Sequence, residues 1–427
     1  MDQAKTAAQE WRESWRVVLA AFVGFSFLTI MSGSLTMFMQ PLADEFGWSR
    51  TLISSGFTVS NVFTAILSPI FGLVIDRYGT RRIAIPGIVL TIGSICAFAF
   101  VNGSVAQWYA LWAIYATISI GVKTTVWTAA VASLFKAGQG LALGITLCGM
   151  AASQTVLPPL ANWLIDAYGW RLAYVWLGVG WGGLTLILCL FFFYDARDRR
   201  RTSGVAPIVE ESAKHDTGNL PGLTIGEAWR NRALWHISIS TLIIMTVTLG
   251  LTIHQVPILN GIGISRADAA LLASLVGIAS LLGKISTGAL LDRFSPNWVG
   301  GVTLAGTAFA FVLLVDGVHS LPLIVFAMLV NGYTQGTKLQ ICTYLTARYA
   351  GMRKFGTIFG FMNSVMAVGS GTGPVFAAFS YDMGGSYTAF LIAGAIGSVL
   401  SGLLLVTLPP FPDWSEKREA GPLGAAS

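Results

Sequence analysis

The stretch Gly72-Leu-Val-Ile-Asp76-Arg77-Tyr78-Gly79-Thr80-Arg81-Arg82 decides the fold of this chain, because its first half occurs twice. The second copy, Gly288-Ala-Leu-Leu-Asp292-Arg293, begins 216 positions later and is followed by a different sequence. Each copy stands at the end of an apolar run and brings an acid and a base together there. A motif repeated in this way predicts that the chain consists of two related halves.

The same shift of 216 positions relates residues well outside this motif. The matched pairs are Pro41 with Pro257, Arg50 with Arg266, Gly140 with Gly356, Gly144 with Gly360, and Asp166 with Asp382. Lys123 and Lys338 are 215 positions apart and match once a one-residue gap is allowed. The repeat therefore extends over most of each half.

The composition is that of a membrane protein. The chain is 54% hydrophobic and 11% charged, with a mean hydropathy of +0.68, whereas soluble domains are about 25% charged. A helix of about 20 apolar residues crosses a bilayer, and we expect twelve such spans. They are 16–40, 52–75, 83–101, 106–134, 138–166, 172–194, 234–260, 268–291, 298–315, 320–347, 355–381 and 387–409. Parallel repeats of this kind place a binding site between the halves near the membrane midplane.

The basic residues predict the topology. Most of the 26 Lys and Arg residues lie in the two tails and in every second loop, so the positive-inside rule places both termini in the cytoplasm. The sequence pI near 9.2 reflects this topology, and we expect no nucleic-acid partner. The first fifteen residues are polar and the first apolar run is long, so no cleavable signal peptide is expected.

The longest break between apolar runs, 195–233, is charged and poor in apolar residues, which is typical of a linker. It contains a predicted short helix around Thr224–Arg232 along the membrane surface. The predicted organisation is an N-terminal half at 1–194, the linker at 195–233, a C-terminal half at 234–410 and a cytoplasmic tail at 411–427.

The chain lacks the residue patterns that an enzyme active site or a metal site requires. The four cysteines, Cys96, Cys148, Cys189 and Cys342, lie inside apolar runs without metal-ligand spacing. No His/Cys/Asp cluster or His-Glu-x-x-His motif occurs. We therefore expect no enzyme, no cofactor and no metal.

Residues 72–82 fit the loop signature of the major facilitator superfamily, Gly-x-x-x-Asp-Arg/Lys-x-Gly-x-Arg/Lys-Arg/Lys, at every position. Four further segments resemble the branch of monocarboxylate transporters and oxalate:formate antiporters. They are Pro41–Arg50, Gly140–Ile145, the Gly-Trp-Arg-Leu-Ala-Tyr segment around Arg171, and Tyr344–Tyr349 leading into Phe355. The resemblance implies an all-α fold of twelve transmembrane helices in two six-helix halves. It also implies secondary transport of small organic anions, by proton symport or anion exchange, by a monomer.

The chain departs from that branch at the positions that bind the substrate and couple transport to protons. Lys284 stands where the branch commonly has an Arg four residues before a glycine of helix 8, and Ser280 stands where animal relatives have an acid. Gln40 appears in place of a lysine in helix 1. Lys338 and Gln340 replace the acids that many bacterial relatives carry in helix 10. These changes favour a more anionic cargo.

Lys123 and Lys338 lie inside long apolar runs, where a charged side chain costs about 2.5–3.5 kcal/mol. No acid lies at a comparable depth in the predicted spans. At about 1.5 Å of rise per residue, both lysines lie too far from the helix ends for the ammonium to reach the surface. Lys284 lies closer to a helix end, so an alternative for this lysine is that its side chain extends to the membrane surface. We expect these lysines to bind an anion, and the pair suits a substrate with two anionic groups.

Further residues are candidates for the cavity lining or for coupling. Tyr115, Trp127, Tyr333 and Asn363, with Gln154 and Gln335, are candidate lining residues, and packing is the alternative for each. His254 is the candidate for proton coupling, because its ordinary pKa lies near neutral pH; a helix-end histidine bonded to a carbonyl is the alternative. The predicted cytoplasmic gate is formed by Asp76, Arg77, Arg81, Arg82, Asp292 and Arg293.

Other functions fit the sequence less well. A proton-coupled multidrug exporter, or an exporter of another solute, needs a mid-membrane acid for cationic cargo. A sugar carrier is expected to cluster Asn, Gln and Trp instead of a lysine pair. A membrane sensor that does not transport is expected to carry a cytosolic output domain, for which the linker is too short. We expect a multi-pass protein of the cell membrane, which in a prokaryote is the inner membrane.

Overall fold

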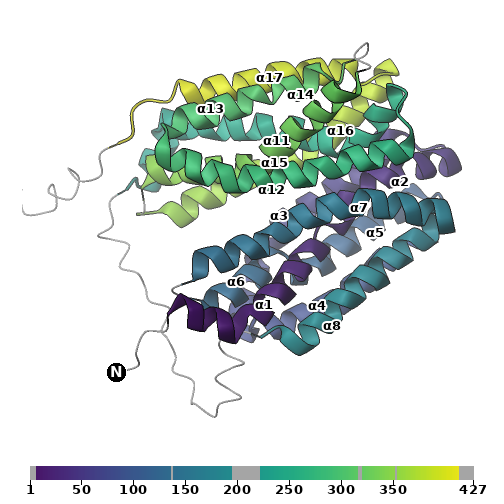
Figure 1. Ribbon diagram of the computed structural model, residues 1–427, viewed down its shortest axis with the longest axis horizontal. Coiled ribbons are helices and arrows are strands. Elements are labelled where there is room, and N and C mark those ends of the chain that lie inside the picture. The colour runs from purple at the N-terminus through teal and green to yellow at the C-terminus, as the bar shows by residue number, and fades with distance from the viewer. Residues whose placement is uncertain (1–5, 136–137, 195–221, 316–319, 352, 413–427) are drawn as a thin grey trace, which may run out of the picture. The chain divides into compact units, whose positions relative to one another are not determined.

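The computed structural model describes residues 6–135, 138–194, 222–315, 320–351 and 353–412 (Figure 1). Within these helices, the side chains at 68–70, 72–77, 140, 288–289, 292 and 355–356 lie outside the description. Most of the predicted linker and the end of the predicted tail, 195–221 and 413–427, also lie outside it. The described residues form helices, with one isolated bridge between Gly222 and Gly351. The all-helical prediction is confirmed.

The first half of the chain forms the following elements. They are α1 (Ala7–Phe27), α2 (Ile30–Phe46), α3 (Arg50–Tyr78), α4 (Thr80–Ala97), η1 (Phe98–Phe100), α5 (Val105–Ser119), η2 (Ile120–Val122), α6 (Thr124–Leu134), α7 (Gln139–Trp176), η3 (Leu177–Trp181) and α8 (Gly182–Phe192). Helix α7 covers the predicted span 138–166 and the start of the span 172–194, and Gly169 divides it with a φ of +79°. Glycine adopts this left-handed backbone at low cost.

The described residues after 221 include a short helix where the sequence predicts one, and its position along the membrane surface stays a prediction. The elements of this second half of the chain are α10 (Ile225–Arg230), α11 (Arg232–Gly261), α12 (Arg266–Arg293), α13 (Pro296–Gly306), α14 (Ala308–Val312), α15 (Leu321–Ala350), α16 (Phe355–Gly384) and α17 (Thr388–Val406). Every predicted span falls on helices in the structure.

Seven helical stretches of the described chain are long and apolar enough to cross a membrane. They are Ala7–Phe46, Thr80–Phe100, Val105–Leu134, Leu141–Phe192, Arg232–Gly261, Arg266–Thr287 and Thr388–Val406. The protein is therefore a multi-pass membrane protein, while the number of twelve spans stays a prediction.

The chain forms two compact units. Unit 1 comprises Met1–Ile208, Thr252–Ile278 and Tyr381–Gly385, and unit 2 comprises Val209–Leu251, Ala279–Ser380 and Ser386–Ser427. Two short segments of the second half of the sequence thus belong to the unit that the first half forms. The domain boundaries predicted from the sequence stay a prediction.

In unit 1, α1 packs against α6, α7 and α8, and α5 packs against α3 and α4. Buried rings fill the interior: Trp108 and Trp112 both contact Phe98, which also lies beside Tyr174. These side chains are at most 1% exposed. The aromatic cluster fixes α5 against the end of α4.

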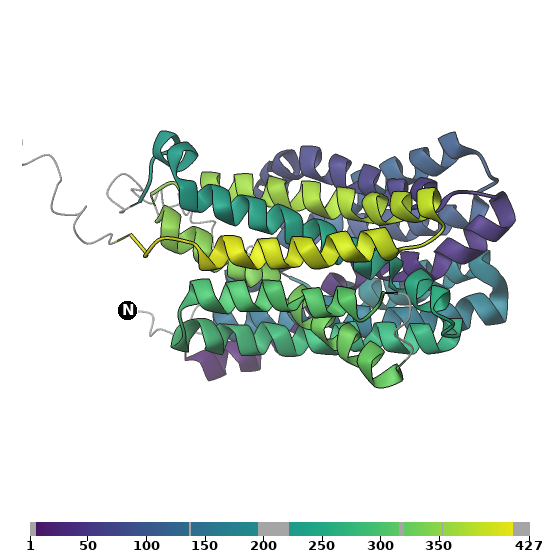
Figure 2. The same cartoon turned by 90° about the horizontal axis from the view of Figure 1, so that it is seen from above.

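In unit 2, α17 runs along α13 and α14 (Figures 1 and 2). A Cβ added at Gly402 would lie 2.4 Å from the carbonyl oxygen of Gly301. Only glycine allows the two backbones to approach so closely, as is common between membrane helices.

Candidate functional site

Lys338 lies in the middle of α15 and is 8% exposed. Its Nζ donates a hydrogen bond of 2.7 Å to the hydroxyl of Thr248 on α11. The Thr248 hydroxyl in turn donates to the carbonyl of Ile244, at 2.5 Å, and its oxygen accepts from the ammonium. Gln335, one helical turn from Lys338, donates through Nε2 to the Thr248 carbonyl at 3.0 Å. These four residues form the Lys338 cluster in unit 2.

Among the described residues, the Lys338 ammonium has no counter-charge. Within the part of the chain that the structure describes, the ammonium contacts the Thr248 hydroxyl and forms no ion pair. An ammonium has three N–H donors, so at least two are available to another group. A buried charge is costly unless it is paired. An anion that accepts these donors would supply the missing pairing.

Lys284 and Tyr333 lie along the contact between α12 and α15. A Cβ at Gly336 would lie 2.1 Å from the carbonyl oxygen of Ser280 and 3.1 Å from the backbone nitrogen of Lys284. One turn away, a Cβ at Gly283 would lie 2.5 Å from the carbonyl oxygen of Tyr333. The two backbones therefore touch. The structure thus brings Lys284 and Tyr333 to the same helix pair that carries Lys338.

Tyr333 also has a side-chain contact across this helix pair. Its hydroxyl accepts a hydrogen bond from the hydroxyl of Ser286 at 3.2 Å. Tyr333 and Lys284 are both half-buried.

Lys123 lies at a break in the span predicted for 106–134. Helix α5 ends at Ser119, η2 follows, and Lys123 has an extended backbone (φ −71°, ψ 168°) at the N-cap of α6. The span predicted for 106–134 thus falls on one helical stretch, Val105–Leu134, that is interrupted at Lys123.

The break has a physical cause. Gly121 packs so closely against Gly87 of α4 that a Cβ at Gly87 would lie 3.0 Å from the Gly121 carbonyl oxygen. The Val122 carbonyl, which the break leaves without a helical partner, accepts a hydrogen bond of 2.7 Å from the indole of Trp127.

The break gives α6 an N-terminus next to a lysine. The first N–H groups of a helix lack partners within the helix, and they attract anions. Thr124 and Thr125, the first two residues of α6, are exposed, whereas Lys123 is half-buried. Irregular backbone within a membrane is found where it is buried in protein or lines a cavity. The sequence analysis missed this helix terminus, although Gly121 before the lysine and the two threonines after it are a weak signal for it.

The other candidate lining residues have different surroundings. Tyr115 is 4% exposed and its ring contacts Phe98 and Trp112. Trp127 is fully buried, lies against Phe193, and has its ring where a Cβ at Gly24 would stand. These contacts favour the packing alternative for Tyr115 and Trp127.

Two polar candidates lie elsewhere. Asn363 of α16 is exposed. Gln154 of α7 has a buried Oε1 that lacks a hydrogen-bond partner among the described residues.

His254 is fully buried in unit 1. Its Nε2 lies 3.0 Å from the hydroxyl of Ser54 on α3. Two residues further along α11, the Val256 N–H donates to the hydroxyl of Thr36 on α2 at 3.3 Å. This segment of α11 is thus bonded to two helices of the first half. The sequence analysis did not identify Ser54 as a neighbour of His254.

The residues of the predicted gate are only partly described. Arg81 donates through Nη2 to the carbonyl of Leu190 on α8, at 2.7 Å. Arg82 and Arg293 are exposed. The side chains of Asp76, Arg77 and Asp292 lie outside the description, so the gate stays a proposal.

A set of polar contacts in unit 1 joins residues that the repeat relates to one another. Arg266 pairs with Asp166 at 3.6 Å and donates to the carbonyl of Met37 at 3.1 Å. Asp382 accepts from the backbone N–H groups of Arg50, at 3.3 Å, and Thr51, at 2.9 Å.

These contacts cross the repeat. Arg50 and Arg266 are counterparts in the two halves, and so are Asp166 and Asp382. Each half therefore contributes the arginine to one contact and the aspartate to the other. The 216-residue shift identified these residues, but their pairing was not predicted.

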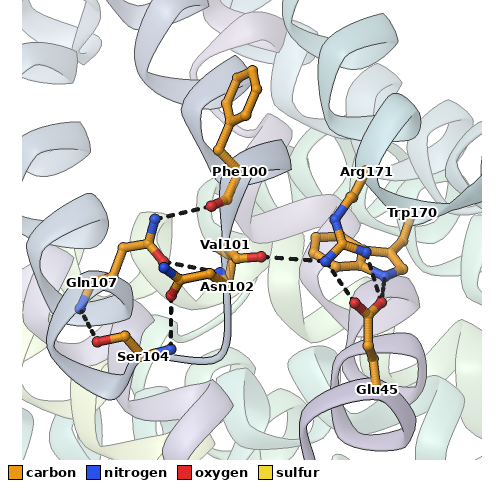
Figure 3. A network of polar contacts seen from close by, with 8 residues as sticks. All are labelled: Glu45, Phe100, Val101, Asn102, Ser104, Gln107, Trp170 and Arg171. Atoms are coloured by element: carbon orange, nitrogen blue, oxygen red, sulfur yellow. Dashed lines mark hydrogen bonds and ion pairs between the residues drawn. The ribbon is translucent and has the colours of Figure 1, made fainter.

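Figure 3 shows a further network in unit 1, centred on Glu45. Glu45 accepts from the indole of Trp170 at 2.7 Å and from both terminal nitrogens of Arg171, at 2.8 and 2.6 Å. Arg171 reaches on to the carbonyl of Val101 at 3.4 Å, and Gln107 closes the adjacent turn by bonding to Phe100 and Asn102. The network therefore ties together the end of α2, the turn before α5 and the C-terminal part of α7.

The same contacts change the acidity of the pair. Glu45 is the second-last residue of α2, and Arg171 lies between the predicted spans 138–166 and 172–194. The hydrogen bond from Arg171 lowers the pKa of the Glu45 carboxyl, and the same bond raises the pKa of the Arg171 guanidinium.

Residues 21–259 and 244–427 match the family model described as Major Facilitator Superfamily. The chain is 25% identical over 405 residues to Monocarboxylate transporter 13 of Bos taurus. The alignment covers 93% of this chain and 89% of the bovine protein.

Two solved structures share the fold at low identity. The D-xylose-proton symporter aligns with a TM-score of 0.70 and 15% identity, over 93% of this chain and 98% of the symporter. A bacterial homolog of the human lysosomal transporter Spinster, inward-facing and unoccupied, aligns with a TM-score of 0.65 and 18% identity, over 91% of this chain and 94% of the homolog.

Proposed function

The chain belongs to the major facilitator superfamily, and on that premise we propose that it is a secondary active transporter of small organic anions. It is a membrane transporter that resembles the monocarboxylate transporters, and it is not an enzyme. The proposed cargo is a mono- or dicarboxylate, aromatic acids included. Alternating access without a cofactor or a metal is the proposed mechanism.

The observation that carries this proposal is the Lys338 ammonium, which is buried in unit 2 beside a neutral hydroxyl. A carboxylate that accepts its remaining N–H donors forms charge-assisted hydrogen bonds, which are about twice as strong as neutral ones. Gln335 holds the Thr248 backbone, and Thr248 holds the ammonium. The position of the charge is therefore set before the substrate arrives.

Lys123 provides a second anion contact in this proposal. Its support is the N-terminus of α6, where the exposed Thr124 and Thr125 stand directly beside the lysine. The sequence repeat makes Lys123 and Lys338 counterparts, so we propose that both bind the same substrate. A substrate with two anionic groups would engage both. Lys284, Tyr333 and Asn363 are proposed as further contacts.

Import of an anion requires coupling. A charge that moves against the membrane potential costs about 2.3 kcal/mol per 100 mV, so the anion must enter with protons or exchange for another anion. We propose His254 as the proton-coupling residue of a symporter, supported by its burial and its contact with Ser54.

The proposed topology places both termini in the cytoplasm and twelve helices across the cell membrane, which in a prokaryote is the inner membrane. In this arrangement the contacts of Arg266 with Asp166 and of Asp382 with the start of α3 lie on the outer side. We propose that they close that side. Asp76, Arg77, Arg81, Arg82, Asp292 and Arg293 are proposed to close the cytoplasmic side. The transporter is proposed to work as a monomer.

Uptake into proteoliposomes tests the proposed cargo and coupling. We expect saturable uptake of a mono-, di- or aromatic carboxylate, and faster uptake when the outside is acidic. Replacement of His254 by Gln is expected to abolish the effect of the pH gradient while counterflow exchange continues. Transport of cationic or neutral solutes without any carboxylate would contradict the proposal.

A further inference from the structure

A groove lies in unit 2 between the short helix α10 and the adjacent ends of α11 and α16 (Figure 2 shows α10 as a short teal helix at one end of α11). The cavity volume is about 140 Å³. Its walls are mainly apolar and include Trp229, Trp235, Ile358, Phe361 and Met362. The groove takes no part in the anion site proposed above.

Aromatic contacts build the groove. The rings of Trp229, Trp235 and Phe361 contact one another, with centroids 5.2 to 6.0 Å apart. The Trp235 indole also donates to the Trp229 carbonyl at 2.9 Å, so the ring is held in place. Yet Trp229 is 55% exposed and Phe361 36% exposed. The three rings therefore present a fixed apolar surface to the outside of the protein.

Contacts at the N-terminus of α10, and in the two residues before it, hold this helix in place. Thr224 and Glu227 form a capping box at its N-terminus. Just before it, the Leu223 N–H donates to the Ala350 carbonyl at 2.8 Å, and Gly222 forms a bridge with Gly351. Gly222 is required there, because a Cβ at this position would lie 2.7 Å from the Arg353 backbone nitrogen. These contacts also bring the backbone of Arg353 beside Gly222, three residues before α10.

The residues around the groove carry an excess of positive charge. Arg230 and Arg232 flank the junction of α10 and α11, and Arg353 and Lys354 precede α16. All four are exposed, and none forms an ion pair within the described chain. The acid nearest in sequence, Glu227, accepts from the backbone and the hydroxyl of Thr224.

We propose that this groove binds an anionic phospholipid, with an acyl chain against Trp229, Trp235 and Phe361 and the phosphate beside Arg230 and Arg232. Helix α11 is a membrane-spanning helix and α10 adjoins its end, so the groove lies where lipid headgroups meet acyl chains. Tryptophans are typical of this depth. Basic clusters next to a transmembrane helix attract anionic lipids. The charge of the rim thus selects the headgroup, and the rings receive the chain.

Native mass spectrometry of the purified full-length protein tests the proposal, with phosphatidylglycerol and phosphatidylcholine of identical acyl chains. We expect the first phosphatidylglycerol to bind about tenfold or more tightly than phosphatidylcholine, since each nearby basic side chain contributes a factor of about five. The variant R230Q/R232Q is expected to lose this preference. The variant A228F, which fills the groove, is expected to weaken the binding of both lipids.

The matched control is R12Q/R16Q, which removes two arginines from α1 in unit 1. It is expected to keep the tight first phosphatidylglycerol. Equal affinity of the wild-type protein for the two lipids would overturn the proposal. So would unchanged lipid binding by A228F. If A228F instead dissolved a dimer and left lipid binding intact, a second copy of the chain would be the occupant of the groove.

Discussion

At the scale of single residues, Lys338 is the buried lysine of the described chain, and its described partner is a hydroxyl. Thr248 cannot neutralise Lys338, but it fixes the direction of the ammonium. Replacing one member of a buried charged pair usually costs several kcal/mol because the other charge is left alone. Lys338 has no such charged partner among the described residues, so under the proposed function a substrate anion would supply the pairing that a partner side chain otherwise provides.

Glu45 and Arg171 show the opposite arrangement, a fully paired charge. Their hydrogen bonds lower the pKa of Glu45 in the folded protein. A carboxyl with a depressed pKa stabilises the fold at pH values above its ordinary value of about 4.3, and the contribution is lost as the pH falls through the folded-state pKa. Both side chains are more than a third exposed, so solvent screening keeps the contribution below about 1 kcal/mol.

We therefore expect E45Q to lower the melting temperature slightly at pH 7, and the difference from the wild-type protein to shrink below about pH 4. Scanning fluorimetry in detergent across pH measures this difference. The control is D44N, because Asp44 bonds to Gln40 of its own helix instead of to another segment. A difference between E45Q and the wild type that grew on acidification would show that the charge of Glu45 is not the stabilising feature.

At the scale of elements, the break before α6 is the feature that most affects the site. Residues 106–134 are apolar throughout, so the sequence predicts one span and places Lys123 within it. The break results from contact between Gly121 and Gly87, which lie on different helices. Such a contact has no signature in the local sequence. The lysine itself was identifiable, but its position at a helix N-terminus was not.

The substitution G87A tests the role of that contact. A methyl group at Gly87 would meet the Gly121 backbone at 3.0 Å, and overpacking of this kind costs about 1–3 kcal/mol. We expect a lower melting temperature and reduced anion transport. The control is G93A on the same helix, where a Cβ has no neighbour within 4 Å. If G87A and G93A behaved alike, close approach of α4 would not be what maintains the break.

The same reasoning applies to partners that lie far apart along the chain. The apolar runs and the 72–82 motif sufficed to predict an all-helical transporter of the right family. Thr248 precedes Lys338 by 90 positions and Ser54 precedes His254 by 200. Both partners are ordinary hydroxyl residues of apolar helices, where many others occur. Only the packing of the helices selects them.

At the scale of the whole molecule, the repeat has a structural counterpart in the crossed contacts of unit 1. The arginine that begins α12 pairs with Asp166, and Asp382 caps the start of α3. The repeat in the sequence therefore corresponds to two related contacts, each between a residue of the first half and one of the second. Contacts of this kind must break if the segments separate, which is why we assign them to closure of the outer side.

We expect D166N and R266Q each to favour the open outer side. In a background without the native cysteines, the cysteine of T36C is expected to react faster with a maleimide in either variant, because Thr36 is 3% exposed beside Val256. The charge-swapped double variant D166R/R266D is expected to restore slow labelling. Equal labelling rates in the wild-type background and all three variants would exclude a role of this pair in closure.

The most direct test of the account is the affinity of K338Q for the transported anion. Hydrogen bonds to charged groups contribute about 1.5–3 kcal/mol, so we expect K338Q to lower kcat/KM for anion uptake by a factor of about ten or more. The exposed Lys354 supplies the matched control, and K354Q is expected to transport like the wild-type protein. Wild-type affinity and uptake in a correctly folded K338Q protein would contradict the assignment of Lys338 as the anion-binding residue.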